Sequence, residues 1–198
     1  MHPTEILSAE HRVIEQVLDC LEAMATRARR EGRLDTERAS AALEFLRVFA
    51  DTCHHGKEEE RLFPMLIARG LSHHTGPIAV MLDDHRAGRE YVRRMQAALV
   101  ASDVDGFARA AVGYAALLRE HIGKEDGVLF PMAESMLDGE ARRALLDSFH
   151  HFEHHDLAAG THERLHAVAD ELARHYGVKL AAERSCAPAP RGCGHGCP

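Results

Sequence analysis

Apolar residues recur at intervals of three and four along most of this chain, which is the pattern of helices that bury one face. The first such helix is expected from about Thr4 to Arg30, a second begins near Thr36, a third at Pro77, and a fourth after Gly106. The pattern therefore predicts an all-α protein. The apolar positions of the four stripes are Leu7, Ile14, Leu18, Leu21 and Ala25; Leu43, Leu46 and Ala50; Ile78, Met81, Leu82, Val92, Met95 and Leu99; and Phe107, Ala110, Tyr114 and Leu117.

The spacing of these helices also predicts how they pack. Four helices of roughly 25 residues joined by short turns favour an antiparallel, up-down-up-down four-helix bundle. Additional C-terminal helices are expected from Asp138-Gly139 and from Thr161, which can cap the last of them. We therefore expect the bundle over residues 1–137, helices packed on it over residues 138–178, and a flexible Cys-containing tail over residues 179–198.

One twelve-residue motif occurs twice. Residues 54–65 read HHGKEEERLFPM and residues 121–132 read HIGKEDGVLFPM, with eight identical positions. In a helix, residues i and i+4 lie on the same face, so each copy points one imidazole and one carboxylate in the same direction: His54 with Glu58, and His121 with Glu125. The proline of each LFPM segment predicts that the helix kinks or loosens one turn beyond these residues.

Two further histidines complete the pattern. His11 lies within the apolar stripe of the first helix and His85 within that of the third, in the similar phrases EHR and DHR. In an antiparallel bundle each of them can reach the height of the motif on the helix that follows. The six candidate metal ligands expected at one level of the bundle are His11, His54, Glu58, His85, His121 and Glu125.

Composition and charge narrow the class of protein. The 198 residues carry a formal charge of −7, with acidic and basic residues interspersed. There is no basic stripe for nucleic acid and no run of about 18 apolar residues for a membrane span. The N-terminus lacks the basic and apolar regions of a secretory signal, so a soluble protein in the cytoplasm is expected.

A site of imidazole and carboxylate without thiolate suits iron, with manganese or zinc as alternatives. One octahedral ion could take all six residues. Two ions use them better, because two carboxylates can bridge and an oxo or hydroxo group can complete the bridge. By this count about two of the roughly twelve octahedral positions stay open for a small ligand.

With these residues, both LFPM segments and the stretch GPIAVMLDDHRAGR at 76–89, the chain resembles the hemerythrin-like HHE cation-binding family over about its first 135 residues. The resemblance implies a four-helix bundle with a non-haem di-iron centre. Oxygen-carrying members add a fifth histidine one turn away on the third helix, where this chain has Met81 and Arg89. The fifth histidine is therefore expected to be missing, which favours redox chemistry over reversible oxygen carriage. Arg89 and Tyr114 are candidates for a polar pocket lining.

The sequence is compatible with three functions. The first is a di-iron protein that binds or reacts with dioxygen, peroxide or nitric oxide. The second is a protein that stores, senses or delivers iron without turnover; the order of four His and two Glu is also similar to that of iron–sulfur cluster repair proteins. The third is a purely helical interaction module, which would leave buried charges without compensation.

Other histidines and cysteines also have metal-ligand spacing. They are His150, His151, His154 and His155 with Glu153 and Asp156; His162 and His166; and Cys186, Cys193, His195 and Cys197 in the tail. The histidines are interpreted as a polar helix face. The tail is interpreted as a flexible end, with metal trapping or reversible oxidation as the alternative. Cys20 and Cys53 are expected to be reduced core thiols.

Overall fold

The computed structural model describes residues 2–152, 158 and 160–184. Every regular element among these residues is a helix and none is a strand, so the all-α prediction is confirmed. The elements, in which η marks π-helical segments, are α1 (Pro3–Glu31), α2 (Thr36–Phe45), η1 (Leu46–His55), η2 (Glu58–Leu62), α3 (Phe63–Ile67), α4 (Pro77–Val100), α5 (Val104–Lys124), η3 (Glu125–Leu129), α6 (Phe130–Met136), α7 (Gly139–His151), α8 (Thr161–Tyr176) and α9 (Ala181–Arg184).

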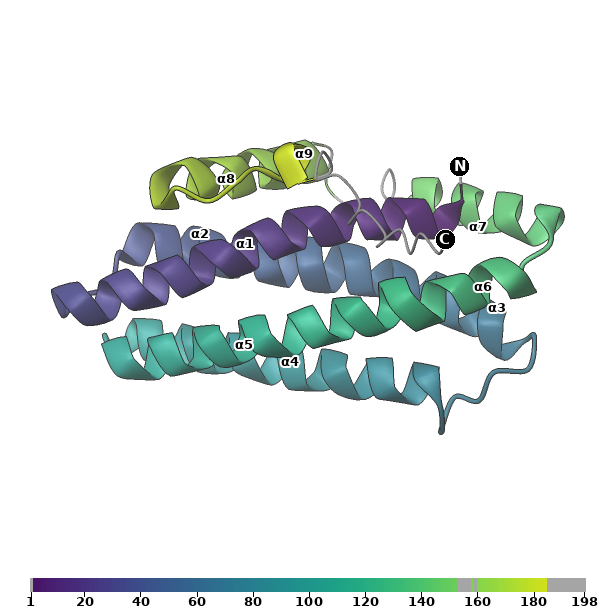
Figure 1. Cartoon of the computed structure of the whole chain (residues 1–198), viewed down its shortest axis with the longest axis horizontal. Helices are drawn as coiled ribbons and strands as arrows, with labels where there is room; N and C mark the ends of the chain where they lie inside the picture. The colour runs from purple at the N-terminus through teal and green to yellow at the C-terminus, as the bar shows by residue number, and fades with distance from the viewer. Residues whose placement is uncertain (1, 153–157, 159, 185–198) are drawn as a thin grey trace, which may run out of the picture.

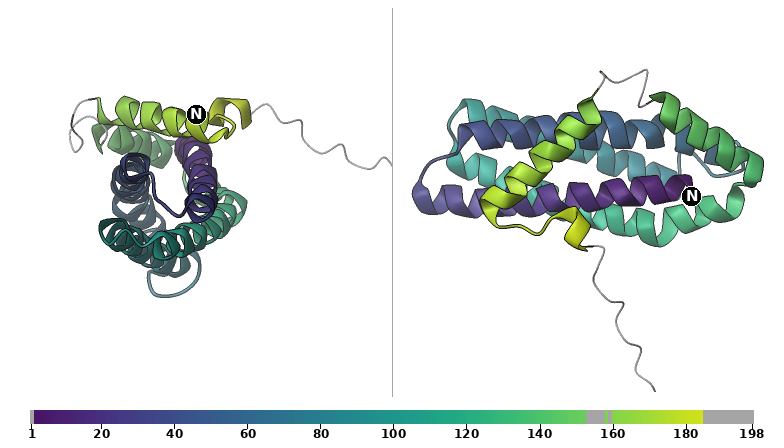
Figure 2. Two further views of the ribbon diagram at one scale, coloured as in Figure 1. Left: turned by 90° about the vertical axis from the view of Figure 1, so that its left-hand side faces the viewer. Right: turned by 90° about the horizontal axis from the view of Figure 1, so that it is seen from above.

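Four long helical segments lie side by side along the long axis of the molecule (Figure 1). They are α1, the run from α2 to α3, α4, and the run from α5 to α6. Helix α8 crosses α1 and α2 obliquely, and α7 lies against α1 and η2 (Figure 2). The described C-terminal helices thus pack on the long segments, whereas the domain boundaries at residues 137 and 178 stay a prediction.

The helices start close to the positions that the sequence predicts. Asp138 caps α7 with hydrogen bonds from two backbone N–H groups, and Asp103 caps α5 by accepting from the Gly106 N–H. The fourth long segment therefore starts three residues before the predicted position. Helix α1 starts at Pro3, one residue before the expected Thr4, and His2 is its N-cap residue. The buried Thr4 hydroxyl donates to the Glu134 carboxylate at 2.5 Å.

Each proline of the repeated motif follows a π-helical segment. Pro64 lies just beyond η2 and Pro131 just beyond η3. Proline lacks an N–H and clashes with the carbonyl four residues earlier, which widens the preceding turn. The predicted loosening thus occurs in both copies, directly after Glu58 and Glu125.

The core is divided into two apolar clusters. One contains Ile14, Phe49, Val92 and Leu118, and the other contains residues such as Leu7, Leu62, Met81 and Leu129. On each of the four long segments, the candidate ligands fall between a residue of one cluster and a residue of the other. They therefore form one polar layer across an otherwise apolar interior. Of the helices in the described residues, none has both the length and the apolar character needed to cross a membrane.

Candidate metal centre

Seven buried side chains make up this polar layer, and none is more than 3% exposed: His11, His54, His55, Glu58, His85, His121 and Glu125. Their ligand atoms form two clusters, in each of which all atoms lie within 4.8 Å of one another. One cluster is His11, His54, Glu58 and Glu125, and the other is His55, Glu58, His85 and His121. All six residues predicted from the sequence are therefore brought together.

The two carboxylates lie between the two clusters. Glu58 places Oε1 3.6 Å from His54 Nε2 and Oε2 3.5 Å from His85 Nε2. Glu125 Oε2 is 3.2 Å from Nε2 of both His11 and His121. Each carboxylate thus faces one imidazole from either half of the layer, which is the arrangement that a bridging ligand requires.

His55 is the residue that sequence reasoning missed. Its ring stacks on the His85 ring with centroids 3.8 Å apart and an interplanar angle of 16°. Its Nε2 atom is buried without a hydrogen bond to any described residue. The third long helix, α4, has Met81 and Arg89 one turn from His85, as expected, so it supplies no fifth histidine. A fifth imidazole comes instead from His55, the residue next to His54.

The backbone explains how two consecutive histidines reach one site. In an α-helix consecutive side chains point about 100° apart, so that only one of them would face the centre. Segment η1 is π-helical up to His55, and its wider turns reduce this angle. The sequence did hold a signal: the second copy has Ile122 at the position of His55, and a buried apolar residue there indicates that this position faces inward.

Every histidine of the layer has a carboxylate beside its Nδ1 atom. The Nδ1–oxygen pairs are His11–Asp126 (2.9 Å), His54–Glu10 (2.9 Å), His85–Glu59 (2.7 Å), His55–Asp51 (3.3 Å) and His121–Asp84 (3.5 Å). Carboxylates at this position fix the tautomer and orientation of the ring and raise the basicity of Nε2. All five imidazoles are thereby prepared to present Nε2 to the centre.

The repeated phrases of the sequence account for four of these carboxylates. Glu10 and Asp84 precede the histidines of EHR and DHR, and they lie against His54 and His121, respectively. Glu59 and Asp126 are the second acidic residues of the two motifs, and they lie against His85 and His11, respectively. The repeat thus encodes the partners of the ligands as well as the ligands.

The motif lysines occupy equivalent places. Lys57, which is buried, contacts the Glu10 carboxylate, and Lys124 Nζ is 2.7 Å from Asp84 Oδ2. Each ammonium therefore offsets the charge of the carboxylate that orients a histidine.

Burial and charge divide the imidazoles into two groups. Burial lowers the pKa of His55 to about 4 and of His85 to about 3, and it also lowers the pKa of His54. For His121 burial acts in the same direction, but the charge of Glu125 and the nearby Asp84 outweigh it and raise the pKa to about 9. For His11, too, the contacts with Asp126 and Glu125 outweigh burial and raise the pKa. The shifts thus favour the neutral form of His54, His55 and His85 and the protonated form of His11 and His121.

Burial and charge also shift the pKa values of the two carboxylates, in opposite directions. Burial and the charge of Glu125 raise the pKa of Glu58 well above its ordinary value. Burial would also raise the pKa of Glu125, but the charge of His121 and the contact with His11 lower it well below the ordinary range. The oxygens of both carboxylates are buried and make no hydrogen bond to a described residue. Such atoms are costly unless a cation or proton compensates them, so the donor set fits bound metal.

A comparison with known families identifies the domain that contains these residues. Residues 2–133 match the hemerythrin HHE cation-binding domain. The chain belongs to this family. Similar proteins include Rv1995 of Mycobacterium tuberculosis strain H37Rv and Mb2018 of Mycobacterium bovis, both described as uncharacterized. Each is 25% identical to this chain over 173 residues, which is 84% of this chain and 67% of the relative. No solved structure matches the chain.

Of the other predicted metal-type groups, those that lie within the described residues do not extend the HHE site. Within the residues that the structure describes, His150, His151, His162 and His166 take part in neither cluster. His162 instead places Nε2 3.7 Å from Glu10 Oε1. His154, His155, Glu153, Asp156 and the cysteines of the tail lie outside the described residues, so those interpretations stay predictions.

We expect metal affinity in this HHE domain to rise with pH. A histidine must lose its proton to bind a metal, and the pKa of about 9 at His121 means that the proton is still present at neutral pH. Each proton displaced makes affinity rise about tenfold per pH unit below that pKa. Competition with a chelator at pH 7 and 8, corrected for the titration of the chelator, should show at least this slope. A pH-independent affinity would contradict the assignment of His121.

Proposed function

We propose that the seven residues of the polar layer hold two non-haem iron ions that bind, and in part react with, dioxygen, peroxide or nitric oxide. The observation that carries this proposal is the pair of clusters that share Glu58, with Glu125 also close to an imidazole of each cluster. An imidazole and carboxylate donor set without thiolate favours iron over copper(I) or an iron–sulfur cluster, and bridging carboxylates favour two ions over one. The up-down-up-down bundle is the scaffold that we propose for this site, supported by the four segments that lie side by side (Figure 1).

His55 changes the number of positions left for a ligand. With five imidazoles, two bridging carboxylates and one bridging oxo or hydroxo group, about one of roughly twelve octahedral positions remains, instead of about two. An ion held by His11 and His54 would keep that position if Glu58 and Glu125 are both shared, because the other cluster contains three imidazoles. A single open position in a buried site favours reversible binding of one small ligand. The expectation of rapid redox chemistry, which assumed four histidines, is revised accordingly.

The chain's own residues supply orientation and exclude water. The five Nδ1 partners hold the rings with Nε2 directed inward. Phe130 stacks on His11 at 5.4 Å and Phe63 on His85 at 6.0 Å, so apolar rings from the two LFPM segments cover the layer on one side. The bound ions would supply the redox-active centre at which the small ligand binds.

The test is metal analysis and optical spectroscopy of the protein and of His55→Ala. The unchanged protein should contain about two irons per chain and bind one azide ion per chain, as the count above implies. His55→Ala should open a second position, alter the azide spectrum and shorten the lifetime of the oxygenated protein. His151→Ala, at the exposed end of α7, should behave like the unchanged protein.

Three outcomes would count against the proposal. One metal ion per chain in fully loaded protein would exclude the dinuclear site, and preferential uptake of zinc in competition would exclude iron. Failure of azide, dioxygen, peroxide and nitric oxide to change the iron spectrum would favour storage or sensing of iron instead.

A further inference from the structure

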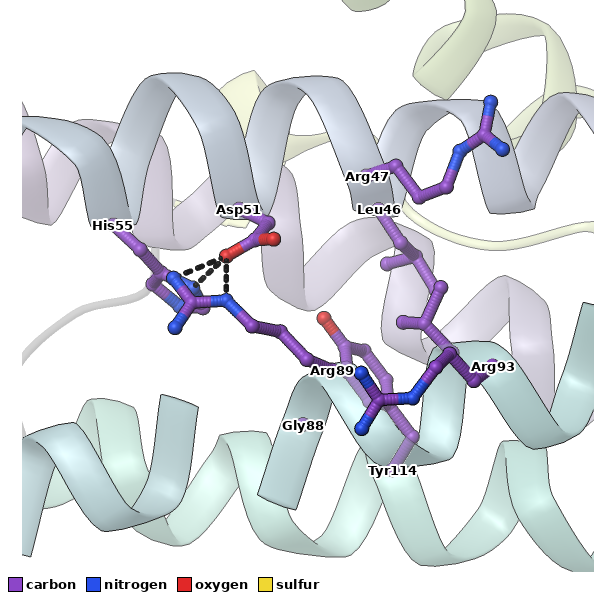
Figure 3. A pocket seen from close by; sticks show the side chains of 9 residues that line it. Leu46, Arg47, Asp51, His55, Gly88, Arg89, Arg93 and Tyr114 are labelled. Atoms are coloured by element: carbon purple, nitrogen blue, oxygen red, sulfur yellow. Dashed lines mark hydrogen bonds and ion pairs between the residues drawn. The ribbon is translucent and has the colours of Figure 1, made fainter. Parts of the chain in front are cut away.

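A cavity of about 240 Å³ lies between η1, α4 and α5 and borders the polar layer, since His55 is part of its lining. Figure 3 shows Asp51, His55 and Arg89 together at one end of it and Leu46 at the other. Leu46, Val92 and the Tyr114 ring give it largely apolar walls. Its volume equals that of about eight water molecules in the liquid, which suits a ligand of about ten non-hydrogen atoms.

Tyr114 points a polar group into this cavity without a partner. The residue is only 2% exposed, and its hydroxyl is directed into the space between the helices (Figure 3). No described residue forms a hydrogen bond with that hydroxyl. Burial raises the pKa of Tyr114, so the phenol keeps its proton and remains a donor. The hydroxyl can therefore donate to an acceptor that is bound in the cavity.

The charges around the cavity favour an anionic acceptor. Three arginines line it, Arg47, Arg89 and Arg93, against one carboxylate, Asp51. Arg89 pairs with two carboxylates: its Nε is 2.8 Å from Asp51 Oδ1, and its Nη2 is 2.8 Å from Glu59 Oε1. Arg93 is exposed and shares the Glu90 carboxylate at the surface, and no carboxylate of the described residues forms an ion pair with Arg47. An anion that enters the cavity therefore meets a net positive lining.

We propose that this cavity binds a small organic carboxylate with an apolar body. Its carboxylate accepts a hydrogen bond from the Tyr114 hydroxyl and lies in the field of the arginines, while its body packs on Leu46 and Val92. The apolar walls favour such a molecule over inorganic phosphate, which would leave them uncovered. The volume is smaller than that of most sites for larger ligands, which begin at about 300 Å³.

The cavity is separate from the open metal position but contacts the metal site. Asp51 lines the cavity and its Oδ1 is 3.3 Å from His55 Nδ1. A bound carboxylate near Arg89 thus competes with Asp51 for the guanidinium group. Because Asp51 also contacts His55, this competition alters the environment of the His55 ring. Binding itself requires neither iron nor reactivity with oxygen, so its failure would leave the proposed function of the metal centre standing.

The experiment is calorimetric titration of the purified, metal-loaded protein with benzoate and with benzamide, its neutral counterpart of similar shape. Benzoate should bind saturably to one site per chain, and benzamide about tenfold or more weakly. Tyr114→Phe keeps the ring and removes the hydroxyl, and it should weaken benzoate binding about tenfold, as expected for a hydrogen bond to a charged group. Arg93→Gln should weaken it about two- to fivefold because this side chain is exposed.

Arg94→Gln is the matched control. Arg94 lies on the same helix, is also exposed and also pairs with Glu90, but it lines a different surface groove with Tyr91. Its substitution should leave benzoate affinity unchanged. The proposal is overturned if benzoate does not bind saturably at millimolar concentrations, if benzamide binds equally well, or if Tyr114→Phe and Arg93→Gln both bind like the unchanged protein.

Discussion

Replacing Glu58 by alanine is expected to weaken the binding of both metal ions, not of one. Glu58 is the residue that appears in both ligand clusters, with one oxygen 3.6 Å from His54 Nε2 and the other 3.5 Å from His85 Nε2. Loss of a group that merely orients a ligand typically reduces metal affinity 10–100-fold. Loss of a shared ligand should cost about 100-fold or more. Metal analysis after dialysis against a weak chelator should find less than one ion per chain, compared with about two in the unchanged protein.

Glu60→Ala is the control for this change. Glu60 lies two residues further along the same π-helical segment, and its side chain is 59% exposed. Its loss should leave metal content unchanged. A Glu58→Ala protein that retains one tightly bound ion would show that the clusters bind independently and that Glu58 does not bridge.

Removing the metal should lower the melting temperature by roughly 8–16 °C. Binding to the folded state alone stabilises it by about 4 kcal/mol when free metal exceeds the dissociation constant about 1,000-fold. A chain of this length changes its melting temperature by about 2–4 °C per kcal/mol. The apo protein should be destabilised in this way because Glu58 and Glu125 then lie buried without hydrogen bonds to described residues.

Thermal unfolding followed by circular dichroism, before and after removal of metal and again after reloading, measures this difference. Reloading should restore the original melting temperature. Equal melting temperatures for the two forms would mean that the seven residues do not bind metal in the folded core. A Glu58→Ala protein should melt at the same temperature with and without added metal, which makes it a second control.

The sequence alone was sufficient for the helices and for six of the seven residues of the polar layer. Helical periodicity depends on backbone geometry that is the same in every protein, so the apolar stripes locate the helices and their buried faces. His11, His54, His85 and His121 all fall on those faces, and Glu58 and Glu125 follow at i+4. The prolines at 64 and 131 predicted the widened turns because their ring clashes are local.

The tertiary structure determined the position of His55 and the contacts between residues of different helices. His55 joins the site because η1 is π-helical, a departure from ideal α-helical geometry for which no proline gives a signal. The same structure brings Asp51 and Arg89 to His55 and directs the Tyr114 hydroxyl into the cavity beside them. These contacts join residues of different helices, and their distances depend on how closely the helices approach and how each is rotated about its axis. Periodicity specifies which face of a helix is buried, but not the partner that each side chain on that face will contact.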